Sequence, residues 1–325
     1  MDGRVPIYSS EVRIVPLIAS ATEVVHALGL GEHQVGRSHE CDFPKAVQKL
    51  PVCTRPAIPV DGDSAEIDRL VKSRVAAAAS VYEVDSDMIA SLNPTHIITQ
   101  TQCKVCAVSR EDVERALRDR TSVDARIVSL EPYSLADIWK DVLRVAEACG
   151  CSTRGEELVE SLQSELILIH NFAHRSSWRP RVVALEWLEP LMCSGNWMPE
   201  LIAMANAVPV LGSAGEHTPY VAWEELVAAD PDVIICMPCG FDIARTRTEM
   251  HWLTSRPNWE HLKAVRTGQI YLCDGNQYMN RPGPRIIESL QILCEILHHK
   301  LFPATFEGTG WERMETPPAK ALSAH

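Results

Sequence analysis

Residues 153–174, TRGEELVESLQSELILIHNFAH, divide this sequence into two halves. Leu158, Leu162 and Leu166 recur in this stretch at the spacing of one helix face, and no strand pattern interrupts them. Gly150 ends the helical pattern before the stretch, and a new series of strand-like segments begins after Pro180. We therefore predict one long helix, from about 153 to 174, that connects two lobes.

Short apolar, β-branched segments recur on both sides of this helix, and most are followed by a helix-like stretch. Strands that alternate with helices favour parallel sheets that are covered by helices on both faces. The sequence therefore predicts the α/β class with two Rossmann-like lobes. The predicted strands are 12–18, 34–37, 95–101 and 125–130 in the first lobe, and 181–187, 232–237 and 269–273 in the second.

The pattern also predicts domain boundaries. An N-terminal α/β lobe covers 11–132, a helical connector covers 133–179, and a C-terminal α/β lobe covers 180–302. Residues 303–325 have little apolar patterning, which predicts a flexible tail. Three helices should begin at capping boxes, in which a serine at the N-cap is followed three positions later by an acidic residue. These pairs are Ser20 with Glu23, Ser109 with Asp112, and Ser134 with Asp137.

Composition excludes some classes of partner. The chain has 325 residues, 46% of them hydrophobic, which is enough for two cores, and a formal net charge of -12. Nucleic acid and anionic membrane surfaces need a basic face, so neither is an expected partner. No apolar run approaches the roughly 20 residues that a membrane-spanning helix needs, so membrane insertion is not expected.

The first residues, MDGRVPIYSSEVRIV, show no export signal. Asp2, Pro6 and Glu11 interrupt any apolar stretch of about 7–15 residues, which is the length that such a signal requires. This predicts a cytoplasmic protein. The 11 cysteines would then lie in a reducing compartment, where thiols or metal ligands are favoured over a disulfide framework.

Polar and soft side chains follow the predicted strands. Ligands of parallel α/β sheets bind at the carboxyl ends of the strands, so these residues are the candidate ligand-binding set. They are Thr22, Glu23, His39, Glu40, Cys41, Cys103, Cys106 and Glu131 in the first lobe, and Glu186, Trp187, Trp197, Cys239, Arg281 and Arg285 in the second.

The pair Cys103 and Cys106 has three interpretations. Two thiolates at this spacing can chelate a metal ion, form a redox pair at a helix start, or simply fill a turn. His39 and Cys41 can complete a four-ligand site with them, and these soft ligands suit zinc or iron. Alternatively, His39 caps a helix end and Cys41 is buried as an ordinary free cysteine.

The aromatic and basic candidates are also open to two interpretations. Trp187 and Trp197 can stack on a flat macrocycle or pack in the core. Arg281 and Arg285 flank the turn Pro282-Gly283-Pro284 and can present forked donors to a carboxylate, phosphate or amide rim. They can equally form surface ion pairs or brace a helix start. The motifs GxSxG, HExxH, Walker A and GxGxxG are absent from the sequence, so no catalytic residue is assigned.

Several of these segments resemble a known family. Residues 15–23 (Val-Pro-Leu-Ile-Ala-Ser-Ala-Thr-Glu), followed by Ala27-Leu-Gly-Leu30 and Val35-Gly-Arg37, resemble the opening of the iron-chelate and cobalamin substrate-binding proteins of ABC importers. Pro16 and Ala19 depart from the pattern, which more often has Ser and Pro there. The similarity continues through 230–235 and 259–271. It implies a class III substrate-binding-protein fold, with two lobes, one long connecting helix and the ligand in the inter-lobe cleft.

Within that family, the chain resembles a subgroup of cobalamin-binding proteins that lack export signals. The segments 37–44, 103–106, 129–132, 185–187, 238–242 and 281–285 carry this similarity. The resemblance implies a corrinoid or another metal chelate as ligand. The alternatives are a cytoplasmic metal- or thiol-dependent enzyme and a simple metal-ion carrier. Exported members are not lined by cysteines in this way, which leaves docking on an importer open.

Overall fold

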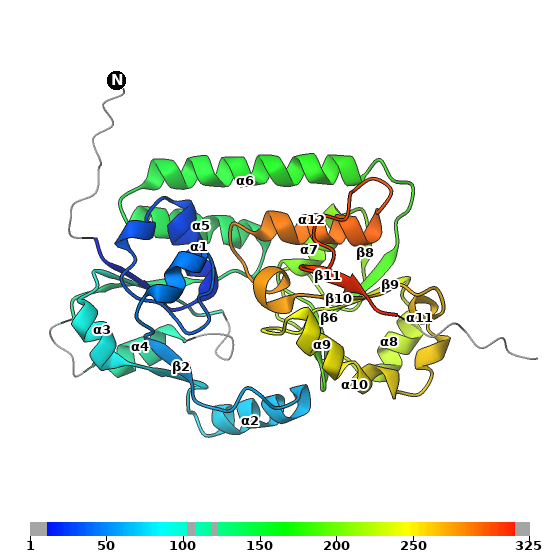
Figure 1. The fold of residues 1–325 in the computed structure, drawn as a ribbon, viewed down its shortest axis with the longest axis horizontal. Helices are drawn as coiled ribbons and strands as arrows, with labels where there is room; N and C mark the ends of the chain where they lie inside the picture. Colours follow the sequence, from blue (N-terminus) through cyan, green and yellow to red (C-terminus); the bar gives the residue numbers. More distant parts are fainter. Residues whose placement is uncertain (1–11, 103–107, 119–122, 316–325) are drawn as a thin grey trace, which may run out of the picture. The chain divides into compact units, whose positions relative to one another are not determined.

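The computed structural model describes residues 12–102, 108–118 and 123–315 (Figure 1). The described chain forms two compact units. The first unit contains the residues up to Ser164, except Asp63–Ala65, and also Pro282–Pro284. The second unit contains Asp63–Ala65, Glu165–Arg281 and the residues from Arg285 onward.

A parallel three-stranded sheet forms the centre of the first unit. Its strands are β1 (Ile14–Pro16), β4 (His96–Gln100) and β5 (Arg126–Leu130), in that order. Val15 and Ile97 are fully buried, as expected for strands that are covered on both faces. The helices of this part are α1 (Ala19–Ala27), α2 (Ser64–Ala76), α3 (Ser86–Leu92), α4 (Arg110–Leu117) and α5 (Leu135–Ala148).

Smaller elements complete the first unit. The strands β2 (Thr54–Pro56) and β3 (Tyr82–Val84) pair antiparallel as a separate two-stranded sheet. Two short 3-10 turns, η1 (Gly31–His33) and η2 (Lys45–Lys49), lie between α1 and β2 in the sequence.

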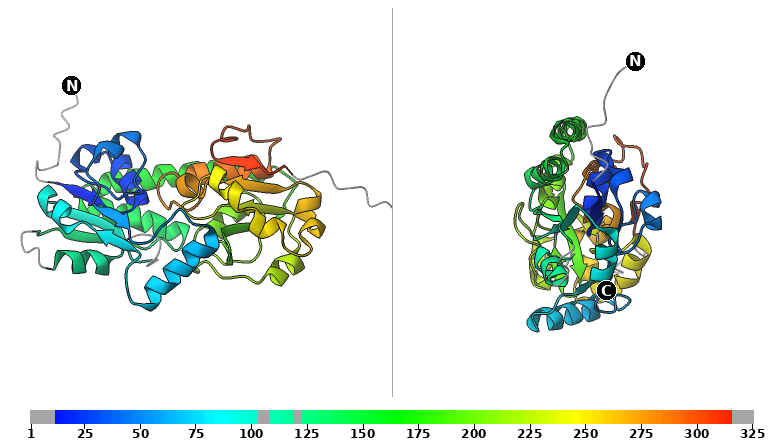
Figure 2. Two further views of the ribbon diagram at one scale, coloured as in Figure 1. Left: turned by 60° about the horizontal axis from the view of Figure 1, so that its bottom comes forward. Right: turned by 90° about the vertical axis from the view of Figure 1, so that its left-hand side faces the viewer.

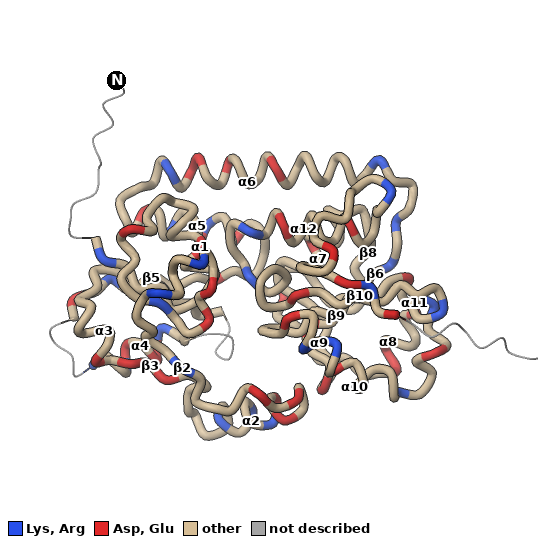
Figure 3. Tube along the Cα trace, in the orientation of Figure 1, with Lys and Arg blue, Asp and Glu red and all other residues tan. Residues whose placement is uncertain are grey.

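The helix α6 (Ser152–Ala173) has 22 residues and leads from the first unit to the second. Leu162 and Leu166 are buried on one face, whereas Leu168 is 69% exposed. Acidic side chains predominate among the charges along this helix (Figure 3). The predicted long connecting helix is therefore confirmed. Among the described helices, none combines the length and apolarity that a membrane crossing requires.

The second unit contains a larger mixed sheet, in the order β11-β10-β9-β6-β7. The strands β6 (Arg181–Leu188), β9 (Val233–Cys236) and β10 (Ile270–Cys273) are parallel to one another. β7 (Leu191–Cys193) and β11 (Trp311–Arg313) pair antiparallel at the two edges, and the red arrow of β11 marks one edge in Figure 2. β8 (Val208–Pro209) adds a short parallel pairing to β6.

Short helices follow the strands of the second unit. They are α7 (Met198–Met204), α8 (Trp223–Ala229), α9 (Ile243–Glu249), α10 (His251–Thr254), the 3-10 turn η3 (Trp259–His261), α11 (Lys263–Arg266), the π-helical turn η4 (Gly275–Met279) and α12 (Ile286–Leu297). The core joins buried residues of the sheet to Trp223, Leu253 and Trp259. α12 is buried along most of its length, which matches its mainly apolar sequence, IIESLQILCEIL.

One predicted strand does not form. Residues 34–37 make only single bridges, from Gln34 to Ile14 and from Arg37 to Val52. Because the segment changes partner within four residues, it cannot build the repeated ladder that defines a strand. The other six predicted segments contain the strands β1, β4, β5, β6, β9 and β10.

Two of the three predicted capping boxes place serine at the N-cap. Ser109 and Asp112 exchange both hydrogen bonds of the box at the start of α4. Ser134 accepts a hydrogen bond from the Asp137 N–H at the start of α5. The prediction for Ser20 is wrong, because α1 begins at Ala19 with Ile18 as its N-cap, so Ser20 lies inside the first turn.

The C-terminal segment differs from the predicted flexible tail. Trp311 is 6% exposed in β11, and its ring packs edge-on at 5.7 Å from that of Tyr271. The carboxylate of Glu295, in α12, accepts hydrogen bonds from the Trp311 indole N–H at 2.9 Å and from the Phe306 N–H at 3.0 Å. A single tryptophan and one buried carboxylate therefore hold this segment, and neither produces a periodic pattern. Residues 316–325 lie outside the described part of the chain.

We expect Glu295→Ala to lower the free energy of unfolding by about 2–4 kcal/mol, because two enclosed N–H donors lose their acceptor and a cavity remains. Urea unfolding at 25 °C measures the change. The matched control is Glu307→Ala at an exposed glutamate of the same segment, which should change stability by less than about 0.5 kcal/mol. Equal losses for the two variants would contradict the assigned role of Glu295.

Candidate functional site

The carboxyl ends of β6, β9 and β10 share one edge of the second-unit sheet. The segments at this edge are hydrogen-bonded to one another. The Cys239 N–H donates to the Glu186 carbonyl at 3.1 Å. The Gly275 and Asn276 N–H groups donate to the Phe241 carbonyl at 2.9 and 3.2 Å. This edge is therefore a fixed backbone frame at the place where parallel sheets bind ligands.

A β-bulge lies in this frame. The register of β6 against β7 shifts between Leu185 and Trp187, so Glu186 is the extra residue that β7 does not pair. A bulge re-aims the side chain that it carries and is common beside active sites. The bulge thus gives Glu186 an orientation that regular alternation along β6 would not provide.

Glu186 lies in a polar but enclosed setting. Its Oε2 accepts a hydrogen bond from the Thr218 hydroxyl at 2.8 Å. Burial raises the pKa of the Glu186 carboxyl and outweighs the opposite effects of Thr218 and His217. A carboxyl group that keeps its proton can donate a hydrogen bond as well as accept one. Glu186 is therefore suited to an amide or carbonyl group of a ligand.

Trp187 belongs to an aromatic group at the same edge. Its ring centroid lies 5.2 Å from that of Phe241, and the Arg245 guanidinium lies 3.9 Å from the Phe241 centroid. The Trp187 indole N–H donates to the Ser64 carbonyl at 3.1 Å. The side chain is half-buried, so part of the indole surface stays accessible.

Gly275 starts the polar turn that follows β10. A Cβ at this position would lie 2.1 Å from the Pro238 carbonyl oxygen, so no other residue fits against the loop after β9. Asp274 caps the turn by accepting hydrogen bonds from the Asn276 and Gln277 N–H groups. Asn276 in turn accepts a hydrogen bond from Arg281 at 3.2 Å.

The two candidate arginines are both buried. Arg281 is 3% exposed and donates a hydrogen bond to Asn276 in the turn after β10. Arg285 is 8% exposed, donates to Glu288 at 2.9 Å and lies over the Tyr278 ring at 4.5 Å from its centroid. Because Arg285 is also the N-cap residue of α12, its contacts fit a brace at a helix start.

In the first unit, Thr22, Glu23 and Cys41 are all buried. The Thr22 hydroxyl donates to the Cys41 sulfur at 3.0 Å, and Cys41 is 1% exposed. These contacts match the alternative in which Cys41 is a packing residue.

His39 and Glu40 are partly exposed. The His39 Nδ1 is 2.8 Å from the Thr54 hydroxyl, and its Nε2 is 3.9 Å from the Glu40 carboxylate. Burial, assisted by the charge of Arg37, lowers the pKa of His39. His39 is therefore neutral at pH 7, which is the form that binds metals.

Glu131 follows β5 and is exposed. It accepts a hydrogen bond from the Thr101 hydroxyl at 2.8 Å, and its N–H donates to Asp141 at 2.8 Å. Cys103 and Cys106 lie outside the described residues. Within the part of the chain that the structure describes, no group of three or more His, Cys, Asp or Glu side chains is arranged to hold a metal ion. A metal site that combines His39 and Cys41 with this cysteine pair stays a prediction.

Trp197 is 7% exposed at the start of α7, so it packs in the second unit.

Most of the described cysteines are also buried. All nine described cysteines are free thiols, and only Cys239 among them is incompletely buried. Burial raises the pKa of Cys236 and of Cys294 to about 12. These thiols are therefore protonated and unreactive at neutral pH.

Two contact residues were not among those that the sequence indicated. Thr218 contacts Glu186, and Ser64 contacts Trp187. Thr218 is 32 residues from Glu186, and Ser64 is 123 residues from Trp187. No local motif marks either residue. Asp274 was detectable in principle, because an aspartate followed by Gly-Asn directly after a strand is a typical turn signal.

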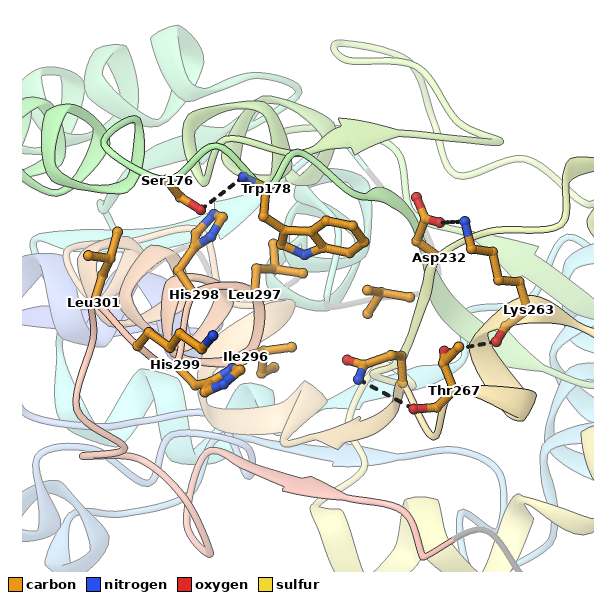
Figure 4. Close-up of a pocket in the computed structure, with 13 residues that line it drawn as sticks. Ser176, Trp178, Asp232, Lys263, Thr267, Ile296, Leu297, His298, His299 and Leu301 are labelled. Atoms are coloured by element: carbon orange, nitrogen blue, oxygen red, sulfur yellow. Dashed lines mark hydrogen bonds and ion pairs between the residues drawn. The ribbon is translucent and has the colours of Figure 1, made fainter. Parts of the chain in front are cut away.

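A cavity of about 340 Å³ lies at the opposite edge of the second-unit sheet (Figure 4). Asp232 and Gln269 line it and directly precede β9 and β10, and Trp178 lines it shortly before β6, so it is at the amino ends of these strands. Many polar groups of its wall bond to one another, including Asp232 to Lys263 at 2.6 Å and the Trp178 N–H to the Ser176 hydroxyl at 3.2 Å. This cavity therefore does not contain the residues that the sequence selected.

Known proteins resemble this chain along most of its length. A protein named as an uncharacterized ABC transporter substrate-binding lipoprotein, YvrC, of Bacillus subtilis is 24% identical over 299 residues, which cover 91% of this chain and 81% of the relative. The vitamin B12-binding protein of Vibrio cholerae is 20% identical and is covered to 88%, as is this chain.

Solved structures share the fold. The crystal structure of a periplasmic heme-binding protein from Pseudomonas aeruginosa matches with a TM-score of 0.68 at 17% identity, covering 94% of this chain and 98% of that chain. The predicted fold, with two α/β lobes and one long connecting helix, is confirmed by this similarity and by the strand topology.

The prediction of a cytoplasmic protein is wrong. The relatives include a protein named as a lipoprotein, and the matching structure is named as periplasmic, so the comparisons point to a location outside the cytoplasm. The hypothesis of a cytoplasmic metal- or thiol-dependent enzyme therefore loses its basis. The model of the periplasmic binding protein family matches residues 14–277, which is most of the chain. This protein therefore belongs to the periplasmic binding protein family, as its resemblance to the iron-chelate and cobalamin members had indicated.

Proposed function

We propose that the protein is the substrate-binding component of an ABC importer and that its ligand is a corrinoid of the cobalamin type. The names of two relatives, a substrate-binding lipoprotein and a vitamin B12-binding protein, support this assignment. The observation that carries it is that the half-buried indole of Trp187, which packs against the buried Phe241, lies at the same sheet edge as the Glu186 carboxyl, whose pKa is raised by burial.

The chemistry of a corrinoid fits this edge. A corrinoid is a large macrocycle whose rim carries neutral amide side chains. Its apolar surface requires aromatic contact, and its amides require neutral donors and acceptors. The carboxyl of Glu186, the hydroxyl of Thr218 and the amides of Asn276 and Gln277 belong to the same edge of the unit.

Heme is the second candidate, because the similar structures include heme-binding proteins. Heme carries two propionate groups, which require cationic partners. The nearby arginines already have partners: Arg281 donates to Asn276, Arg285 donates to Glu288, and Arg245 lies over the Phe241 ring. These charges favour the amide-rimmed ligand.

In the first unit, His39 is the candidate ligand for the metal of the chelate. Its Nδ1 is held by Thr54, which leaves Nε2 as the nitrogen that can face a metal. We retain Cys103 and Cys106 as candidates for the same role. Cys41 is a weaker candidate, because its sulfur is enclosed beside Thr22.

We expect Trp187→Ala to weaken the binding of cyanocobalamin by about 10-fold or more, because aromatic contact with the ligand is lost. Isothermal titration calorimetry of the purified protein measures this change. The matched control is Trp178→Ala at a tryptophan that is 49% exposed at the opposite sheet edge, which should bind as the wild type does. Binding of hemin but not of cyanocobalamin by the wild-type protein would replace the corrinoid with the second candidate.

We expect Glu186→Gln to gain stability relative to the wild type as the pH rises from 5 to 8. Burial raises the folded-state pKa of Glu186 above its unfolded value, so the unfolded wild type releases this proton at a lower pH than the folded protein does. The wild type therefore loses stability as the pH rises from the unfolded-state pKa to the folded-state pKa. Glutamine imitates the protonated form at every pH and keeps an acceptor for Thr218. Calorimetric melting at both pH values measures the difference in Tm between the two proteins. A difference that does not change with pH would show that the carboxyl is ordinarily ionised.

A further inference from the structure

The short segment Asp63–Ala65 belongs to the second unit, although the residues before and after it belong to the first. Ser64, the first residue of α2, is fully buried there. Its three backbone and side-chain polar groups all have partners in the second unit. The N–H and hydroxyl donate to Glu249, and the carbonyl accepts from Trp187.

The position of Glu249 favours its contact with Ser64 but does not favour the stability of its own helix, α9. It is the last residue of α9, where the helix dipole disfavours a negative charge. It is nonetheless 5% exposed, and its Oε2 accepts from the Ser64 N–H at 3.0 Å and from the Ser64 hydroxyl at 2.8 Å. The first N–H groups of a helix have no partner within that helix, so the start of α2 supplies the donors that Glu249 needs.

The same serine orients Trp187. Its carbonyl accepts the indole N–H at 3.1 Å, so the ring is fixed at its nitrogen by Ser64 and packs against Phe241 at 5.2 Å between centroids. An indole without the first contact could rotate about its side-chain bonds. A ligand that stacks on it would then have to immobilise the ring as it binds, which lowers affinity.

We propose that Glu249 is a positioning residue of the ligand site: through Ser64 it fixes the orientation in which Trp187 meets the ligand. This inference rests on the proposed function, because it assumes that Trp187 contacts the ligand. Glu249 acts without touching the ligand itself. Its effect on binding therefore depends on the indole N–H of Trp187.

A double-mutant cycle tests this dependence. Trp187→Phe keeps an aromatic ring but removes the N–H, and Glu249→Ala removes the acceptor for Ser64. We expect each single variant to weaken cyanocobalamin binding by roughly 5- to 10-fold, and the double variant to bind no more weakly than about the worse single variant, because the two changes break one chain of contacts. Losses that multiply, to roughly 25- to 100-fold, would show independent effects and overturn the proposal.

Two further variants separate positioning from general damage. Glu249→Gln keeps an acceptor oxygen and should bind within about 2-fold of the wild type. Glu260→Ala removes a glutamate that is 71% exposed in the same unit and should have no effect. A loss in Glu249→Gln as large as that in Glu249→Ala would contradict the hydrogen-bonded role.

A ligand-free measurement distinguishes failure of this inference from failure of the proposed function. The indole N–H signal of Trp187 is assigned in the NMR spectrum by its absence in Trp187→Phe. Its exchange with D2O should be about 10-fold faster or more in Glu249→Ala than in the wild type and in Glu260→Ala. Unchanged exchange overturns the positioning of Trp187 even when cyanocobalamin binds. Faster exchange in a protein that does not bind cyanocobalamin overturns the ligand assignment and supports the positioning of Trp187 by Glu249.

Discussion

The parallel pairing of β6 with β9, and of β9 with β10, is the constraint on which the site depends. It places Glu186, Phe241 and Asp274 at one edge, although 88 residues separate the first from the last along the chain. The register matters as much as the direction. Side chains alternate between the faces of a strand, so a slip of one residue would exchange the fully buried Leu185 with the polar Glu186. The buried apolar residues of β6 and β9 prevent that slip, and the bulge at Glu186 then interrupts the alternation at the one position where a polar group is useful.

Much of this architecture follows from local patterns. Apolar segments such as 95–101 and 232–237 contain β4 and β9, and the regular leucines after Thr153 mark α6. The failures have physical reasons. Residues 34–37 meet two different partners and so build no ladder, and Ser20 matches a capping motif but lies two residues after the actual N-cap, Ile18. Trp311 anchors β11 through its contacts with Tyr271 and Glu295, and isolated tertiary contacts have no period to detect.

The sequence indicated some of the residues at the proposed site. Strand order and the rule that loops follow carboxyl ends were enough to select Glu186 and Trp187. They were not enough to select Ser64, Thr218 or Glu249, because these reach the site through tertiary contacts. The spacing of His39 and Cys41 did not reveal that Cys41 lies enclosed beside Thr22, because spacing does not show burial. The location was misjudged for a different reason: it rested on the first residues alone, whereas the relatives point outside the cytoplasm.

The burial of the thiols has a consequence for how the protein reaches its working state. Burial raises the pKa of Cys236 to about 12, so its thiol stays protonated at pH 7, and the thiolate is the species that attacks disulfides. An unfolded chain has thiols with a pKa near 8.5, so a few per cent are ionised and all are accessible. Under oxidising conditions, cross-linking of the unfolded chain therefore competes with folding. The rate at which the two cores close decides how many molecules escape as reduced, native protein.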